Sequence, residues 1–131
     1  TSVFGGLMGS LFQNRGVAGA IIDGACRDTD ELRDLGFIVF SRAVTARGTH
    51  TMFSGRKDDY ELNVPVQCGG IVVSPGDIIV ADEIGVTVIP SADLEVVLVA
   101  AREQAEREEA TRRRIREGRT FEQLLEEFGR I

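Results

Sequence analysis

The sequence has no tryptophan, one histidine and two cysteines among its 131 residues. The single histidine, His50, excludes a metal site built from several histidines, and we expect it at the surface of a polar turn. Cys26 and Cys68 lack the C-x-x-C spacing of a zinc knuckle and are too few for a disulfide scaffold. The small number and the spacing of the cysteines favour a reducing, cytoplasmic setting.

Long apolar runs are also absent, and residues 1–5 contain no basic residue, so we expect neither a membrane segment nor a secretion signal. The length suits one domain with a core of Val, Ile, Leu and Ala. Of the charged residues, 13 acidic and 7 basic side chains lie within residues 1–101. This acidic excess disfavours a nucleic-acid surface and is compatible with cation binding.

Residues 19–28 combine a short apolar run with two adjacent, opposite charges. The run at 19–22 predicts a strand buried on both faces, which ends at Asp23-Gly24 before a helix whose first turn is acidic. Arg27 and Asp28 would then lie at the carboxyl edge of a parallel sheet, where such sheets bind ligands. Arg can bind a carboxylate through two N–H groups, and Asp can hold a divalent cation. The alternative is a solvated helix cap with a surface ion pair.

Two blocks carry a family resemblance. Residues 16–28 (GVAGAIIDGACRD) resemble the core signature of the RraA-like family, which includes the 4-hydroxy-4-methyl-2-oxoglutarate/4-carboxy-4-hydroxy-2-oxoadipate aldolases. Residues 64–77 and 81–86 resemble a second block in the same order. The resemblance implies an α/β fold, a layered α/β/α sandwich of the swivelling-domain type with a long carboxyl-terminal helix. Relative to the family an amino-terminal segment is missing, so we expect a fragment, a processed chain or a natural short form.

The resemblance also implies a chemistry: a divalent-metal-dependent lyase that cleaves 4-hydroxy-2-oxo acids to pyruvate, with oxaloacetate decarboxylation as a side activity. Arg27 would bind the carboxylate of the substrate, and Asp28 would ligate Mg²⁺ or Mn²⁺. Backbone contacts to the 2-oxo acid end would come from the turn at Gly5, Gly6, Leu7 and Met8, for which a tight glycine turn is the alternative. No Schiff-base lysine is required, and the only lysine, Lys57, is expected in a solvated loop.

In the family's aldolases the active site lies between subunits, so the resemblance implies a homotrimer or homohexamer. A glutamate on the late helix of the adjacent subunit would complete the outer shell of the metal. Glu109 is the expected residue, and Glu103, Glu106 and Glu108 remain open.

Two positions depart from the family pattern. Gly6 stands where catalytic members usually have an acidic residue that helps to hold metal-bound water, and Ile84 stands where most members have an acid. The change at Gly6 and the missing start favour an alternative, a non-catalytic RraA-like protein that regulates a ribonuclease by protein–protein binding. The intact pair of Arg27 and Asp28 opposes that alternative.

The remaining elements follow from local patterns. We expect a helix after Gly5, with no strand before it and with Leu7, Met8, Leu11 and Phe12 on one face. Further strands are expected at 37–40, 64–66, 71–73, 78–81 and 86–89. Asp82 and Glu83, in the last hairpin connection, are turn acids or, alternatively, metal ligands.

A long helix is expected after Pro90-Ser91, and its charged half can be stabilised by Glu–Arg pairs. Its arginine cluster at 112–116 could bind RNA, but the neighbouring glutamates cancel the charge. Residues 120–123 form a capping box that begins a last helix with an apolar stripe. We divide the chain into an α/β body, 1–90, and helices, 91–131, that pack on a neighbouring subunit.

Overall fold

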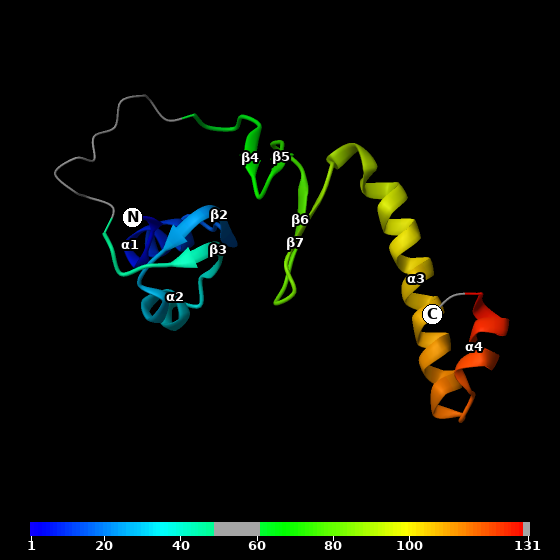
Figure 1. Ribbon diagram of the computed structural model, residues 1–131. Helices are drawn as coiled ribbons and strands as arrows, with labels where there is room; N and C mark the ends of the chain where they lie inside the picture. The colour runs from blue at the N-terminus through cyan, green and yellow to red at the C-terminus, as the bar shows by residue number, and fades with distance from the viewer. Residues whose placement is uncertain (49–60, 130–131) are drawn as a thin grey trace. The chain divides into compact units, whose positions relative to one another are not determined.

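The computed structural model describes residues 1–48 and 61–129. It contains two compact units, Thr1–Val72 and Val73–Ile131, each of which is described by itself. The mixed α/β class and the long carboxyl-terminal helix are confirmed (Figure 1). The division of the chain at residue 90 stays a prediction.

The first unit contains a three-stranded parallel sheet connected by two helices (Figure 1). Its strands lie in the order β1-β2-β3. This order places the carboxyl end of β2 at the centre of one sheet edge. The elements are β1 (Ser2–Phe4), α1 (Gly6–Gln13), β2 (Gly19–Cys26), α2 (Thr29–Leu35) and β3 (Ile38–Val44).

Strand β1 corrects the expectation that no strand precedes the first helix. Three residues are too few to show a periodic pattern, and the strand forms because it pairs with β2, with Phe4 opposite Cys26. The expected end of β2 at Asp23-Gly24 is also wrong, since the register only shifts between Ile22 and Ala25 and the strand continues.

The core of this unit consists of Phe4, Cys26, Leu32 and Phe37. The ring of Phe4 stacks on Phe37 at 6.0 Å and meets Phe12 edge-on at 5.6 Å. Residues of β2 contact this core on one face only, so the expectation of a strand buried on both faces is not met within the unit.

Helix α1 packs on the core through its glycines and Phe12, whereas the other residues of its predicted apolar face are exposed. Gly6 and Gly9 are buried, whereas Leu7 and Leu11 are 79% and 42% exposed. A Cβ at Gly9 would lie 2.5 Å from Leu32 Cδ2, so the missing side chain lets α1 approach α2 closely.

Two small sheets follow, β4 (Val66–Cys68) with β5 (Ile71–Val73) and β6 (Ile78–Ala81) with β7 (Val86–Ile89). The predicted turn before β6 is closed by a hydrogen bond from Asp77 N to Ser74 O, 3.1 Å.

A 3-10 turn (Ser91–Asp93) then leads into α3 (Leu94–Arg116) and α4 (Phe121–Phe128), which lies beside it (Figure 1). The capping box at Thr120 and Gln123 is confirmed. Leu124 is buried, and Arg114 Nε donates to Glu127 Oε1 at 2.9 Å, which joins the two helices. Among the described residues no helix is long and apolar enough to cross a membrane.

Candidate functional site

Arg27 and Asp28 lie at the end of β2, as the sequence predicts. The backbone is held there from both neighbouring strands. Arg27 N donates to Phe4 O at 2.9 Å, and Cys26 O accepts from Thr45 N at 2.9 Å. The pair therefore extends from a fixed part of the sheet edge.

Asp28 begins α2 in an unusual way. Its backbone is left-handed, with φ 53° and ψ 44°, and its side chain does not cap the helix it begins. Instead Oδ2 accepts from Gly6 N at 3.2 Å and from Arg27 Nε at 3.1 Å. Unfavourable backbone conformations of this kind are concentrated at functional sites, because they aim a side chain away from its ordinary local partner.

Glycines on two sides leave room for the pair. A Cβ at Gly5 would lie 2.6 Å from Asp28 Oδ2 and 2.9 Å from Arg27 Cγ. A Cβ at Gly48 would lie 3.2 Å from Arg27 Nη1. The side chains of Arg27 and Asp28 remain 31% and 38% exposed, so a ligand can reach both.

A third charged group, Glu31, lies in the acidic first turn of α2. In the structure its carboxylate occupies the space that a side chain at Gly6 would fill. No periodic signal in the sequence identifies this placement, because Asp28 precedes α2 with a left-handed backbone and does not share a helix face with Glu31.

The start of α1 supplies backbone N–H groups to the same place. Gly6 N is engaged by Asp28. The N–H groups of Leu7 and Met8 lie in the first turn of α1, where backbone N–H groups have no acceptor within the helix. They can therefore donate hydrogen bonds to a substrate oxygen.

The residues fit magnesium better than a metal that requires a protein cage. No group of three or more His, Cys, Asp or Glu side chains in the described residues can hold a metal ion. Both recorded hydrogen bonds to the Asp28 carboxylate in this part of the chain use Oδ2, so Oδ1 is the oxygen suited to a metal. Magnesium characteristically takes one or two carboxylates and keeps several waters.

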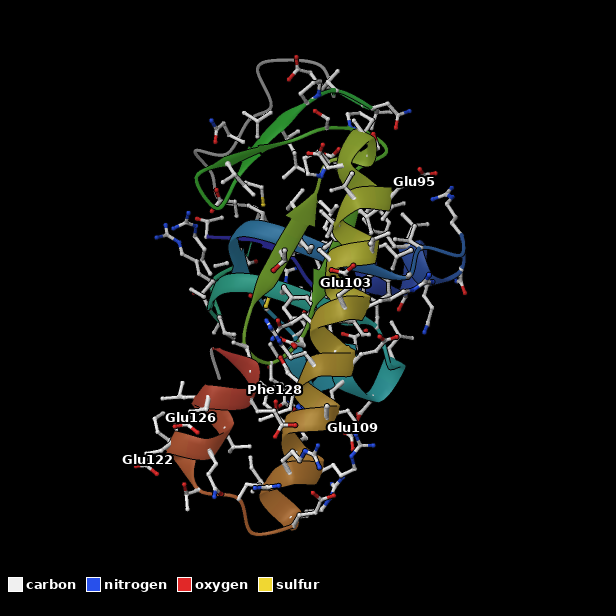
Figure 2. All side chains as sticks on the ribbon, turned by 90° about the vertical axis from the view of Figure 1, so that its right-hand side faces the viewer. Glu95, Glu103, Glu109, Glu122, Glu126 and Phe128 are labelled. Carbon is white, nitrogen blue, oxygen red and sulfur yellow. The ribbon has the colours of Figure 1, made fainter. Side chains whose placement is uncertain are left out.

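Glu109 lies in the second half of α3 (Figure 2). Its carboxylate accepts from Arg116 Nη2 at 2.9 Å and lies 3.7 Å from Arg112 Nη1. The hydrogen bond from Arg116 lowers the pKa of Glu109, so this exposed side chain is ionised at neutral pH. A role at a metal would require Glu109 to exchange these arginine contacts.

Asp82 builds the turn between β6 and β7. Its Oδ1 accepts from Ile84 N at 2.8 Å and from Gly85 N at 3.3 Å, which accords with the interpretation as a turn acid. His50 and Lys57 lie outside the described residues.

A second arrangement that the sequence did not reveal involves Asp23. Asp23 pairs with Arg42 on β3 and accepts from Gly69 N at 3.0 Å, so it connects two strands with the turn after β4. The Arg42 hydrogen bond, followed by that of Gly69, lowers the pKa of Asp23.

Comparison with known proteins bears on this site. The chain is 36% identical over 125 residues to an uncharacterized protein of Methanocaldococcus jannaschii, covering 95% of this chain and 58% of that protein. It is 33% identical over 90 residues to the 4-hydroxy-4-methyl-2-oxoglutarate aldolase of Thermus thermophilus, covering 69% and 52%. The chain thus spans about half the length of the curated relatives it matches.

Among solved structures it resembles Streptomyces coelicolor RraAS2, described as an unusual member of the RNase ES inhibitor RraA protein family. The TM-score is 0.74 at 28% identity, covering 87% of this chain and 56% of the other. The family model for RraA-like proteins, described as Aldolase/RraA, matches residues 1–88 and therefore includes Arg27, Asp28 and the start of α1. The chain belongs to the RraA-like family.

Proposed function

We propose that this chain carries the catalytic centre of a divalent-metal-dependent lyase that cleaves 4-hydroxy-2-oxo acids to pyruvate and also decarboxylates oxaloacetate. The observation that carries the proposal is the arrangement of Arg27 and Asp28 at the end of β2, with the Asp28 carboxylate turned from its own helix toward Gly6 and Arg27. The aldolase among the relatives supports this choice of reaction.

Arg27 binds and orients the substrate in this proposal. Its Nε is held by Asp28, which fixes the plane of the guanidinium and leaves the two Nη groups for a carboxylate. Cleavage of the C3–C4 bond moves negative charge onto the 2-oxo oxygen. The charge of Arg27 and the N–H groups of Leu7 and Met8 stabilise that charge in a fixed geometry.

Asp28 is the residue that would hold Mg²⁺ or Mn²⁺. When bound, the ion supplies polarisation of the 2-oxo group and charge stabilisation of several kcal/mol. In a homotrimer or homohexamer, Glu109 of a neighbouring subunit would complete the outer shell. In that role the carboxylate would accept a hydrogen bond from metal-bound water in place of its contacts with Arg116 and Arg112.

The test is release of pyruvate from oxaloacetate and from 4-hydroxy-4-methyl-2-oxoglutarate, with and without Mg²⁺. We expect metal-dependent turnover of both compounds and a loss on the order of 100-fold in Arg27→Ala and in Asp28→Ala. Asp34→Asn, an exposed acid on α2, is the matched control. Unchanged turnover in either of the first two variants would remove that residue from the mechanism.

A second candidate function is regulation of a ribonuclease by protein–protein binding. The likeness to the RNase ES inhibitor family and the glycine at position 6 favour it. It is tested by inhibition of RNase ES with the unaltered chain and with Arg27→Ala. Equal inhibition by both, without pyruvate release from either compound, would support this second function over the first.

A further inference from the structure

The carboxylate of Glu31 lies against the start of α1, beside the pair of Arg27 and Asp28. Gly5 packs against Arg27 and Asp28, and the next residue, Gly6, packs against Glu31. Adjacent Cα atoms are about 3.8 Å apart, so the guanidinium and the second carboxylate contact neighbouring points of the chain. A small substrate bound to Arg27 therefore lies within reach of Glu31.

Of the two carboxylates beside Arg27, those of Asp28 and Glu31, only that of Asp28 is engaged by hydrogen bonds among the described residues. Asp28 Oδ2 accepts two hydrogen bonds, and Asp28 Oδ1 is the oxygen suited to a metal. Arg27 can only donate. In the described part of the chain Glu31 makes no ion pair or hydrogen bond, so its carboxylate is open to a proton from a ligand.

Cleavage of a 4-hydroxy-2-oxo acid requires such an acceptor. The C4 hydroxyl must lose its proton as the C3–C4 bond breaks, because its O–H electron pair becomes the second bond of the new carbonyl. Decarboxylation of oxaloacetate breaks the C3–C4 bond beside a carboxylate that is already ionised. It releases CO₂ without removing a hydroxyl proton.

We propose that Glu31 is the general base of the aldol cleavage, an inference that rests on the proposed function. The Glu31 carboxylate takes the C4 hydroxyl proton and the C4 carbonyl forms. The C3–C4 electron pair moves into a C2–C3 double bond, and the 2-oxo oxygen becomes negative. The resulting enolate then takes a proton from water at C3 to give pyruvate, and the protonated Glu31 releases its proton to water, so the proton removed and the proton added balance and no further reactant is needed.

The two reactions separate this role from the rest of the site. In Glu31→Gln we expect kcat for cleavage of 4-hydroxy-4-methyl-2-oxoglutarate to fall about 100-fold or more, while KM changes little. Oxaloacetate decarboxylation should stay within about twofold, because general-base removal of a hydroxyl proton is not part of that reaction. Asp34→Asn, another exposed acid on α2, should alter neither reaction.

Equal loss of both reactions, or loss of neither, in Glu31→Gln would overturn the role of Glu31 while leaving the proposed function intact. Absence of both reactions in the unaltered protein would contradict the proposed function and, with it, this inference.

The placement of Glu31 has a test that does not depend on activity. Gly6→Ala should change the Tm of the unaltered chain less favourably than that of Glu31→Ala, since in the unaltered chain the new methyl group must displace the Glu31 carboxylate. In a Glu31→Ala background the same change should not lower the Tm, because the space is then vacant and alanine favours helix over glycine. Equal changes of Tm in both backgrounds would show that Glu31 does not occupy this space.

Discussion

Asp28 adopts a left-handed backbone conformation that most residue types other than glycine avoid, and Asn63 is the only other described non-glycine residue with a positive φ. The conformation turns the carboxylate away from the N–H groups of α2 and toward Gly6 and Arg27. The site is thus maintained against a local conformational preference.

Comparison of two variants at this position measures that preference. Asp28→Gly should be more stable than Asp28→Ala by about 1 kcal/mol, because both lack the carboxylate but only alanine is strained at positive φ. Denaturant unfolding of the two proteins measures the difference. In an ordinary helix alanine is more stabilising than glycine. A higher stability of Asp28→Ala than of Asp28→Gly would therefore contradict a left-handed backbone at residue 28.

Gly5 keeps the charged pair in its place. Gly5→Ala would bring a methyl group to 2.6 Å from Asp28 Oδ2 and should separate Asp28 from Arg27. We expect kcat/KM for oxaloacetate decarboxylation to fall on the order of 100-fold, since small displacements of catalytic groups are costly. Gly85→Ala, which meets no atom within 4 Å and has no positive φ, is the control and should retain full activity.

At this scale the sequence predicted Arg27 and Asp28, because two charges directly follow an apolar run that forms a strand. It did not predict the backbone of Asp28 or the position of Glu31. Both depend on the approach of α1 to α2 through Gly6 and Gly9, and a tertiary contact of this kind leaves no periodic signal in the sequence.

A helix or strand was predicted correctly where neighbouring residues determine it, and was missed where it depends on a partner distant in the sequence. Helix α4 and its capping box depend on neighbouring residues and were predicted correctly. Strand β1 depends on its partner β2 and was not predicted. The exposed apolar face of α1 shows the same limit, since helical spacing identifies a stripe but does not say whether a partner covers it.

Asp23 on β2 pairs with Arg42 on β3 and accepts a hydrogen bond from Gly69 N after β4. These interactions predict that the stability of the fold depends on pH. Asp23 has a pKa below its usual 3.8 in the folded chain, chiefly because of Arg42 and then Gly69 N. Folding therefore favours the ionised form. This stabilisation is fully present above pH 3.8 and is lost as the pH falls through the lower folded pKa.

In Asp23→Asn the Tm should therefore decline less steeply below pH 3.8 than in the unaltered chain. Asp34→Asn serves as the matched control and should follow the unaltered curve. A steeper decline in Asp23→Asn, or identical curves, would contradict the stabilising role of ionised Asp23.

At the scale of the whole molecule, we propose a site that combines Asp28 with Glu109 of another copy of the chain. Asp28 belongs to the first unit and Glu109 to the second, and Glu109 is paired with arginines of its own helix.

Mixing of inactive variants tests the contribution of a neighbouring subunit. Asp28→Ala and Glu109→Gln should each be poorly active alone. Unfolded together and refolded, they should regain a measurable part of the activity, because some sites then combine an intact Asp28 with an intact Glu109 of another subunit. Light scattering would report the assembly, and activity no greater than that of the separate variants would contradict a shared site.

The most direct test of the central claim, that the carboxylate of Asp28 holds a divalent cation, is a calorimetric titration of Mg²⁺ into the chain and into Asp28→Asn. Asparagine tolerates the left-handed backbone, so this variant removes the charge while keeping the conformation. The account predicts saturable binding to the unaltered chain and an affinity at least about tenfold weaker in the variant. Equal binding by the two proteins, or none by the unaltered chain, would contradict it.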